Sequence, residues 1–168
     1  RLEDLVNEFF DITRFNLTRL ELEVQPTDLT RMLEQICSEF GPQLAEQDLR
    51  CRLELPPRLL YPCDPDKMAR VFDNLLRNAC HYSYPSSTVV IAAYQDAEAV
   101  HLSFTNAGKT IPQEKLNRIF EQFFRLDSSR ATRTGGAGRG LAIAKENVEL
   151  HGGSIAAESA ADHITITI

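Results

Sequence analysis

The chain has 168 residues, enough for one domain with its own core, and a formal net charge of −6. The acidic balance argues against a nucleic-acid-binding protein, which usually presents a basic surface. No apolar run approaches the roughly 20 residues of a membrane-spanning helix, and no signal peptide is visible. Because the chain begins with Arg1 rather than Met, we expect a piece of a larger protein.

The first half of the chain predicts helices and short strands. A helix is expected over 1–20, where apolar residues repeat at three- and four-residue spacing, as in a coiled-coil seam that needs a partner. The seam residues are Leu2, Leu5, Phe9 and Ile12. A short strand around 20–24, a helix over 29–47 and a strand over 51–55 are expected to follow.

The four cysteines show neither C-x-x-C pairs nor the spacing of a metal site. They are Cys37, Cys51, Cys63 and Cys80. We therefore expect buried, reduced thiols of a cytosolic compartment.

A helix from Asp64 to just before Pro85 carries the first candidate site. Its apolar residues form one face, and Asn74, Asn78 and His81 fall at i, i+4 and i+7, so they line up beside that face. Such a stripe is commonly no more than a solvated helix surface.

The second half predicts a hairpin, two helices and a closing pair of strands. The expected ranges are strands 88–95 and 100–105, a short helix 113–119, a lid 120–134, a helix from 141 to His151, and strands 154–157 and 164–168. The sum is an α+β fold, with helices on one face of a mixed sheet.

A glycine-rich loop, 135–140, runs into the helix that starts at Leu141. Glycines allow close backbone approach, and a helix N-terminus favours a phosphate. The spacing matches neither the P-loop nor G-x-G-x-x-G, and no protein-kinase motif set is present. The loop and the asparagine stripe together predict a Mg–nucleotide site.

Five motifs in order resemble those of the ATP-binding catalytic domain of sensor histidine kinases, in the Bergerat-fold ATPase superfamily. They are the N box (74–79), the first glycine box (106–108), the F box (119–125), the second glycine box (136–141) and His-Gly-Gly (151–153). The resemblance covers nearly all of 26–168, and stretches 123–130 and 135–146 look like vancomycin-resistance sensor kinases. It implies a Bergerat-fold α/β sandwich over 23–168, preceded over 1–22 by the second helix of a dimerisation hairpin.

The resemblance also implies residue roles. Asn78 would coordinate Mg²⁺ through its side-chain oxygen, and Asn74 would contact the phosphates or the waters of the metal, so these two are the catalytic candidates. Asn106 stands where the family usually has Asp, which accepts a hydrogen bond from the adenine amino group; Asn keeps an acceptor oxygen. The other implied cofactor contacts are His81, Tyr82, Gly108, Ile111, Arg125, Arg130, Gly136, Gly138, Gly140 and Leu141.

Three further positions depart from the family pattern. His81 replaces the common Lys, Thr110 replaces the second glycine of its box, and Arg139 replaces an apolar residue that is commonly Leu. The lid arginines Arg125 and Arg130 are either phosphate ligands, which guanidinium groups suit, or exposed side chains.

The implied mechanism lacks a base for hydrolysis. Hydrolysing relatives of this fold carry Glu four residues before the metal-binding Asn, and here that residue is Asn74, so fast hydrolysis is not expected. The γ-phosphoryl group would pass to a hairpin histidine outside this chain, because none of the four histidines lies in an H-[ED]-x-x-[TN]-P motif. The implied partners are a response regulator and a second copy, in the cytoplasmic part of a bacterial membrane protein.

Two alternatives stay open. One is a related ATPase, or a serine-type protein kinase of the same fold. The other is a degenerate module for interaction and signalling, which Asn106, Thr110 and Arg139 motivate.

Overall fold

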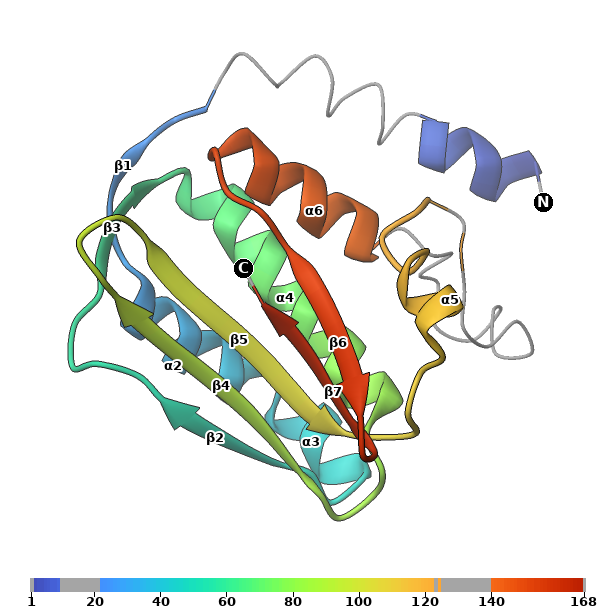
Figure 1. Cartoon of the computed structure of the whole chain (residues 1–168). Helices are drawn as coiled ribbons and strands as arrows, with labels where there is room; N and C mark the ends of the chain where they lie inside the picture. The colour runs from blue at the N-terminus through green and yellow to red at the C-terminus, as the bar shows by residue number, and fades with distance from the viewer. Residues whose placement is uncertain (1, 10–21, 123, 125–139, 168) are drawn as a thin grey trace.

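The computed structural model describes residues 2–9, 22–122, 124 and 140–167. Its main sheet has the strand order β2-β4-β5-β7-β6, in which β2 and β4 run parallel and the other neighbours antiparallel. The strands are β2 (Arg50–Glu54), β4 (Thr88–Gln95), β5 (Val100–Ala107), β6 (Ala156–Ala160) and β7 (His163–Thr167). Helices α2 (Leu29–Glu39), α4 (Pro65–Tyr82) and α6 (Gly140–Leu150) lie on one face of this sheet (Figure 1). The predicted α+β architecture is therefore confirmed.

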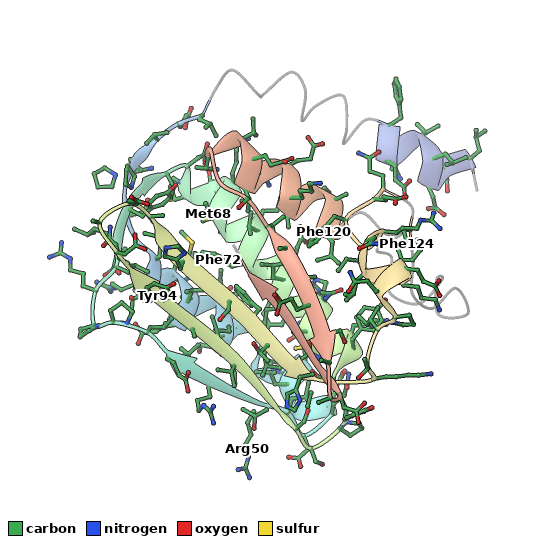
Figure 2. All side chains as sticks on the ribbon, in the orientation of Figure 1. Arg50, Met68, Phe72, Tyr94, Phe120 and Phe124 are labelled. Carbon is green, nitrogen blue, oxygen red and sulfur yellow. A yellow bond between two sulfur atoms is a disulfide. The ribbon has the colours of Figure 1, made fainter. Side chains whose placement is uncertain are left out.

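The core lies between α4 and the central strands. Alternate residues of β4 and β5 are buried, as expected for a sheet that is covered on one face. Met68 and Phe72 point from α4 into this layer (Figure 2), and the ring centroid of Phe72 lies 6.1 Å from that of Phe104 on β5. This packing fixes the rotation of α4 about its axis and thereby the direction of its polar side.

A second, two-stranded sheet pairs β1 (Gln25–Asp28) with β3 (Leu60–Cys63) in antiparallel register. The predicted strand over 20–24 is wrong for its described part, because 22–24 have no regular structure. Pro26 lies opposite Pro62 in the pair. Both strands are edges, where a proline is tolerated because its missing N–H costs no central ladder bond.

The predicted helix over 29–47 is also wrong, because the structure has two helices there. Helix α2 is capped by Asp28, whose carboxylate accepts from the Thr30 N–H, and it ends at Phe40. Helix α3 (Gly41–Glu46) then begins with Pro42 in its first turn. Proline removes an intrahelical donor and clashes with the preceding turn, which explains why the helix is interrupted here. Helix α5 (Gln113–Leu116) is likewise shorter than predicted.

The cysteine prediction is wrong for one pair. Cys37 of α2 and Cys51 of β2 form a disulfide, with Cα atoms 6.9 Å apart. Cys63 and Cys80 are buried free thiols, as predicted. Burial raises the pKa of the Cys63 thiol, opposed by a hydrogen bond with Thr27, and burial also raises the pKa of Cys80, opposed by Arg77.

Residues 2–9 are helical, and Leu2 and Leu5 are 78% and 55% exposed. The rest of the predicted 1–20 helix lies outside the described residues. Within the described ranges, no helix has the length and apolar character needed to cross a bilayer.

Candidate nucleotide site

Helix α4 is fixed at its start by the sequence Asp64-Pro65. Asp64 is the N-cap, and its Oδ1 accepts from the Lys67 N–H at 3.2 Å. Proline suits the first helical turn, where its missing N–H would have no partner. Because the apolar face of α4 packs on the sheet, Asn74, Asn78 and His81 lie half-buried along its side.

Asn74 meets the start of α6, as the sequence predicted for these two motifs. A Cβ placed on Gly140 would lie 3.8 Å from Asn74 Oδ1, an ordinary packing contact. A methyl group at residue 140 would therefore touch Asn74 without a clash. The N box and the last residue of the glycine loop thus border one another.

A second close approach joins the end of α4 to the loop after β5. A Cβ on Gly108 would overlap the carbonyl oxygen of Tyr82 and would lie 3.0 Å from Asn106 Nδ2. Only glycine leaves this space free. Gly108 therefore sets Tyr82 and Asn106 side by side, although they belong to different elements.

A small apolar cluster forms one wall of the same region. Ile111, Leu116 and Ile119 are buried together, and the predicted contacts Tyr82 and Leu141 pack against them. Phe120 and Phe124 belong to this cluster and lie near α5 (Figure 2). Three predicted site residues from separate parts of the chain, Tyr82, Ile111 and Leu141, are thus brought together in one apolar cluster.

Two buried amide nitrogens of the described residues lack a hydrogen-bond partner, and they belong to Asn74 and Asn106. Leaving such a group unpaired costs about 1–3 kcal/mol. Buried polar groups without partners are rare, so each calls for an explanation. Both residues are predicted nucleotide contacts, and a bound ligand with acceptor atoms would satisfy both. Because the motifs predict both residues as nucleotide contacts, these unpaired amides fit a nucleotide site.

The turn between β6 and β7 forms hydrogen bonds with the first glycine box. The sequence did not predict this contact. The Asp162 N–H donates to Thr110 Oγ1 at 2.8 Å, and the Gly108 N–H donates to the Asp162 carbonyl at 2.9 Å. Ala161 and Asp162 both have positive φ, +50° and +58°. The usual sequence signal of such a turn is Asn-Gly or Asp-Gly, which is absent here.

The Asp162 carboxylate also contacts Tyr84, just after α4. Partial desolvation and the negative charge of Asp162, which hydrogen-bonds the phenol, raise the pKa of Tyr84. The Ile111 N–H donates to Ser159 Oγ on β6 at 2.8 Å. Thr110, where the family usually has glycine, is therefore part of a bonded junction.

A further junction joins the far ends of α4 and α6. The Asp64 N–H donates to His151 Nε2 at 3.1 Å, and His151 Nδ1 is 2.7 Å from the Asn147 carbonyl, which assigns the proton to Nδ1. Asp64 Oδ2 also accepts from the Glu23 N–H at 3.1 Å. The sequence marked His151 as a helix end and as part of the His-Gly-Gly motif, but it did not predict this bond, because partners 87 residues apart leave no local signal.

The other predicted contacts are placed as follows. His81 stacks edge-on against Tyr82, with ring centroids 4.6 Å apart. Arg125, Arg130, Gly136, Gly138 and Arg139, and most of the predicted lid, lie outside the described residues.

Residues 63–168 match the family described as "Histidine kinase-, DNA gyrase B-, and HSP90-like ATPase". The chain belongs to this ATPase family. It is 50% identical over 168 residues to the sensor protein VanSC of Enterococcus gallinarum, all of this chain aligning with 46% of that protein. The chain therefore spans less than half the length of this relative.

Solved structures share the fold of this ATPase family member. The catalytic domain of histidine kinase ThkA superposes with a TM-score of 0.76 at 24% identity, over 86% of this chain and 93% of that one. Full-length ShkA in complex with AMPPNP gives a TM-score of 0.81 at 22% identity, over 99% of this chain and 35% of ShkA.

Proposed function

We propose that this chain is the ATP-binding catalytic domain of a sensor histidine kinase and that it binds Mg·ATP between α4, α6 and the end of β5. The observation that carries this proposal is the pair of unpartnered buried amides, Asn74 and Asn106, at two ends of the same region. The membership of the ATPase family supports it, as does the nucleotide analogue held by ShkA.

In this proposal Asn78 holds Mg²⁺ through its amide oxygen, a ligand that this hard cation favours. The metal supplies charge neutralisation on the transferring phosphate when bound. Asn74 lies against the first residue of α6. The N–H groups of that helix start and its dipole favour phosphate oxygens. The side chains of Tyr82, Ile111 and Leu141 exclude water from the adenine base of the nucleotide.

We infer transfer to an external nucleophile rather than hydrolysis. Phosphoryl transfer needs mainly positioning and charge neutralisation. Asn74 carries no carboxylate, and an amide cannot remove a proton from water. The chain therefore holds the γ-phosphoryl group for a histidine that it does not itself carry.

The wider protein is part of the same proposal. We propose that residues 1–22 end a dimerisation hairpin and that 23–168 form the ATP-binding domain, in the cytoplasmic part of a membrane sensor that forms a homodimer. The exposed Leu2 and Leu5 on the helical 2–9 segment support a helical partner. A response regulator would receive the phosphoryl group, and the likeness to VanSC supports a role in antibiotic resistance.

The test is a transfer assay with ATP labelled at the γ-phosphate and a histidine-bearing helical hairpin supplied in trans. We expect acid-labile label on the hairpin and none on this chain. Acid-stable label on serine, or rapid release of phosphate, would favour the serine-type kinase or ATPase. Absence of Mg·ATP binding at millimolar concentration would favour the interaction module, which the departures at Asn106, Thr110 and Arg139 motivate.

A further inference from the structure

The turn that joins β6 to β7 has an unusual backbone. Ala161 and Asp162 both lie in the left-handed region, with φ of +50° and +58°, and neither is a glycine. Residues with a Cβ rarely adopt this conformation, and they keep it only where neighbouring contacts hold it in place. Such positions gather at functional sites, so the partners of this turn indicate what it does.

The turn is bonded to the loop that follows β5 (108–111). The Gly108 N–H donates to the Asp162 carbonyl at 2.9 Å, and the Asp162 N–H donates to Thr110 Oγ1 at 2.8 Å. The same Thr110 hydroxyl donates to Asp162 Oδ1 at 3.3 Å, so its donor and one of its acceptor sites are both used. One residue later, the Ile111 N–H donates to Ser159 Oγ of β6. The β6–β7 hairpin thus holds the loop at Gly108, Thr110 and Ile111, of which the first and the last are predicted nucleotide contacts.

The Asp162 carboxylate also ties this loop to the end of α4. It accepts a hydrogen bond from the phenol of Tyr84, which lies two residues after the last residue of that helix. The Tyr84 N–H donates to the Ala107 carbonyl at 2.8 Å, at the end of β5. Tyr84 and Thr110 therefore reach one carboxylate from two segments, and neither segment can shift without breaking a bond to Asp162.

A loop that already has its bound shape loses less conformational freedom when a ligand binds, and the affinity rises accordingly. We propose that Asp162 is a positioning residue of the nucleotide site, because its carboxylate holds Thr110 and Tyr84 and so keeps the 108–111 loop in its binding conformation. This inference rests on the proposed nucleotide site, and it concerns a residue outside the predicted nucleotide contacts. A purely structural role of Asp162 would change the stability of the chain and leave the affinity for ATP as it is.

The experiment measures the dissociation constant of Mg·ATP by calorimetry and the thermal midpoint of the same variants. Asp162→Gly removes the carboxylate, keeps the backbone N–H and C=O and relieves the positive φ, so its thermal midpoint is expected to stay near that of the wild-type chain. Its affinity for Mg·ATP is expected to fall roughly three- to tenfold. Tyr84→Phe removes one bond to the same carboxylate and is expected to weaken ATP binding about twofold. The double variant should bind no more weakly than Asp162→Gly alone, because both changes break the same bond.

Asp96→Gly is the matched control. Asp96 is also an exposed aspartate of a hairpin turn, and its carboxylate accepts from the Glu98 and Ala99 N–H groups, each at 2.8 Å. It lies between β4 and β5, at the opposite end of β5 from the 108–111 loop. Its replacement should therefore leave the affinity for ATP unchanged.

The outcomes separate this inference from the function on which it rests. If the wild-type chain binds Mg·ATP and a folded Asp162→Gly chain binds it equally well, the inference is wrong and the proposed function stands. An equal loss of affinity in Asp96→Gly also overturns it, since the effect would then not depend on this junction. If Asp162→Gly does not fold, Tyr84→Phe decides, because wild-type affinity in that variant rejects the inference. If the wild-type chain itself fails to bind Mg·ATP, the proposed function fails and the inference fails with it.

Discussion

Asn78 lies one helical turn beyond Asn74 on α4 and is half-buried, so its amide is supported by the helix yet open on one side. We predict that Asn78→Ala weakens Mg-dependent ATP binding by roughly 10- to 100-fold, because Mg²⁺ loses its protein oxygen. Calorimetric titrations with and without Mg²⁺ measure this. The thermal midpoint should hardly change, since the side chain is not part of the core.

Asn117→Ala is the matched control, because Asn117 is an exposed asparagine at the end of α5. Its affinity for ATP should equal that of the wild-type chain. If Asn78→Ala also binds as the wild type does, Asn78 is not the metal ligand.

The cysteines make a second prediction at this scale. With Cys37 and Cys51 joined, only Cys63 and Cys80 remain as thiols. We expect an aromatic disulfide reagent to titrate two thiols per chain in denaturant without reductant, and almost none in the native chain. Four reactive thiols would contradict the Cys37–Cys51 disulfide.

The same thiols predict an alkaline limit to stability. Burial raises the pKa of Cys63 and Cys80 above the ordinary value of 9.0. Raised pKa values mean that the folded chain holds these protons more tightly than the unfolded chain. Their contribution is complete below about pH 9 and is lost as the pH rises through the folded values. Denaturant unfolding at several pH values measures this loss as a fall in the free energy of unfolding at alkaline pH.

At the scale of elements, the junction of α4 with α6 rests on one imidazole. His151→Leu removes the acceptor of the buried Asp64 N–H, so we expect a loss of about 1–3 kcal/mol in the free energy of unfolding. Urea unfolding measures this. His163→Leu, at an exposed histidine, should stay within about 0.5 kcal/mol of wild type. Equal effects of the two changes would show that the His151 bond contributes nothing specific.

The first glycine box depends on a hydroxyl. Thr110→Val keeps the shape of the side chain but removes the oxygen that accepts from the Asp162 N–H. We expect about 1 kcal/mol of destabilisation, which lowers the melting temperature by roughly 2–4 °C in a chain of this size. Thr110→Ser keeps the hydroxyl and should melt closer to wild type. If the Thr110→Val variant melts at the same temperature as the Thr110→Ser variant, the hydrogen bond from the Asp162 N–H does not stabilise this junction.

At the scale of the whole molecule, local rules predicted some elements and not others. Helix α4 was predictable because the Asp64-Pro65 start, the apolar period and the stop before Pro85 all agree. The break between α2 and α3 was missed because the apolar pattern continues through Pro42. The pair β1 and β3 was missed because each strand contains a proline, which usually argues against a strand.

Some features of the candidate site were likewise predictable from the sequence, and others were not. The polar stripe of α4 and the glycine loop follow from sequence spacing, and the contact of Asn74 with Gly140 was expected from them. The unpaired state of Asn74 and Asn106 was not predictable, since it depends on what neighbouring elements leave uncovered. The bonds from Asp162 to Thr110 and from Asp64 to His151 join residues far apart in sequence, so only the folded chain reveals them.

The measurement that decides most is a calorimetric titration of the wild-type chain with ATP, with and without Mg²⁺. We predict saturable binding of one ATP per chain that is strengthened by Mg²⁺, because Asn74 and Asn78 lie one turn apart on α4 and Asn106 lies beside Tyr82 at the end of that helix. Absence of binding at millimolar ATP, by a chain that remains folded, would contradict a nucleotide site between α4, α6 and the end of β5.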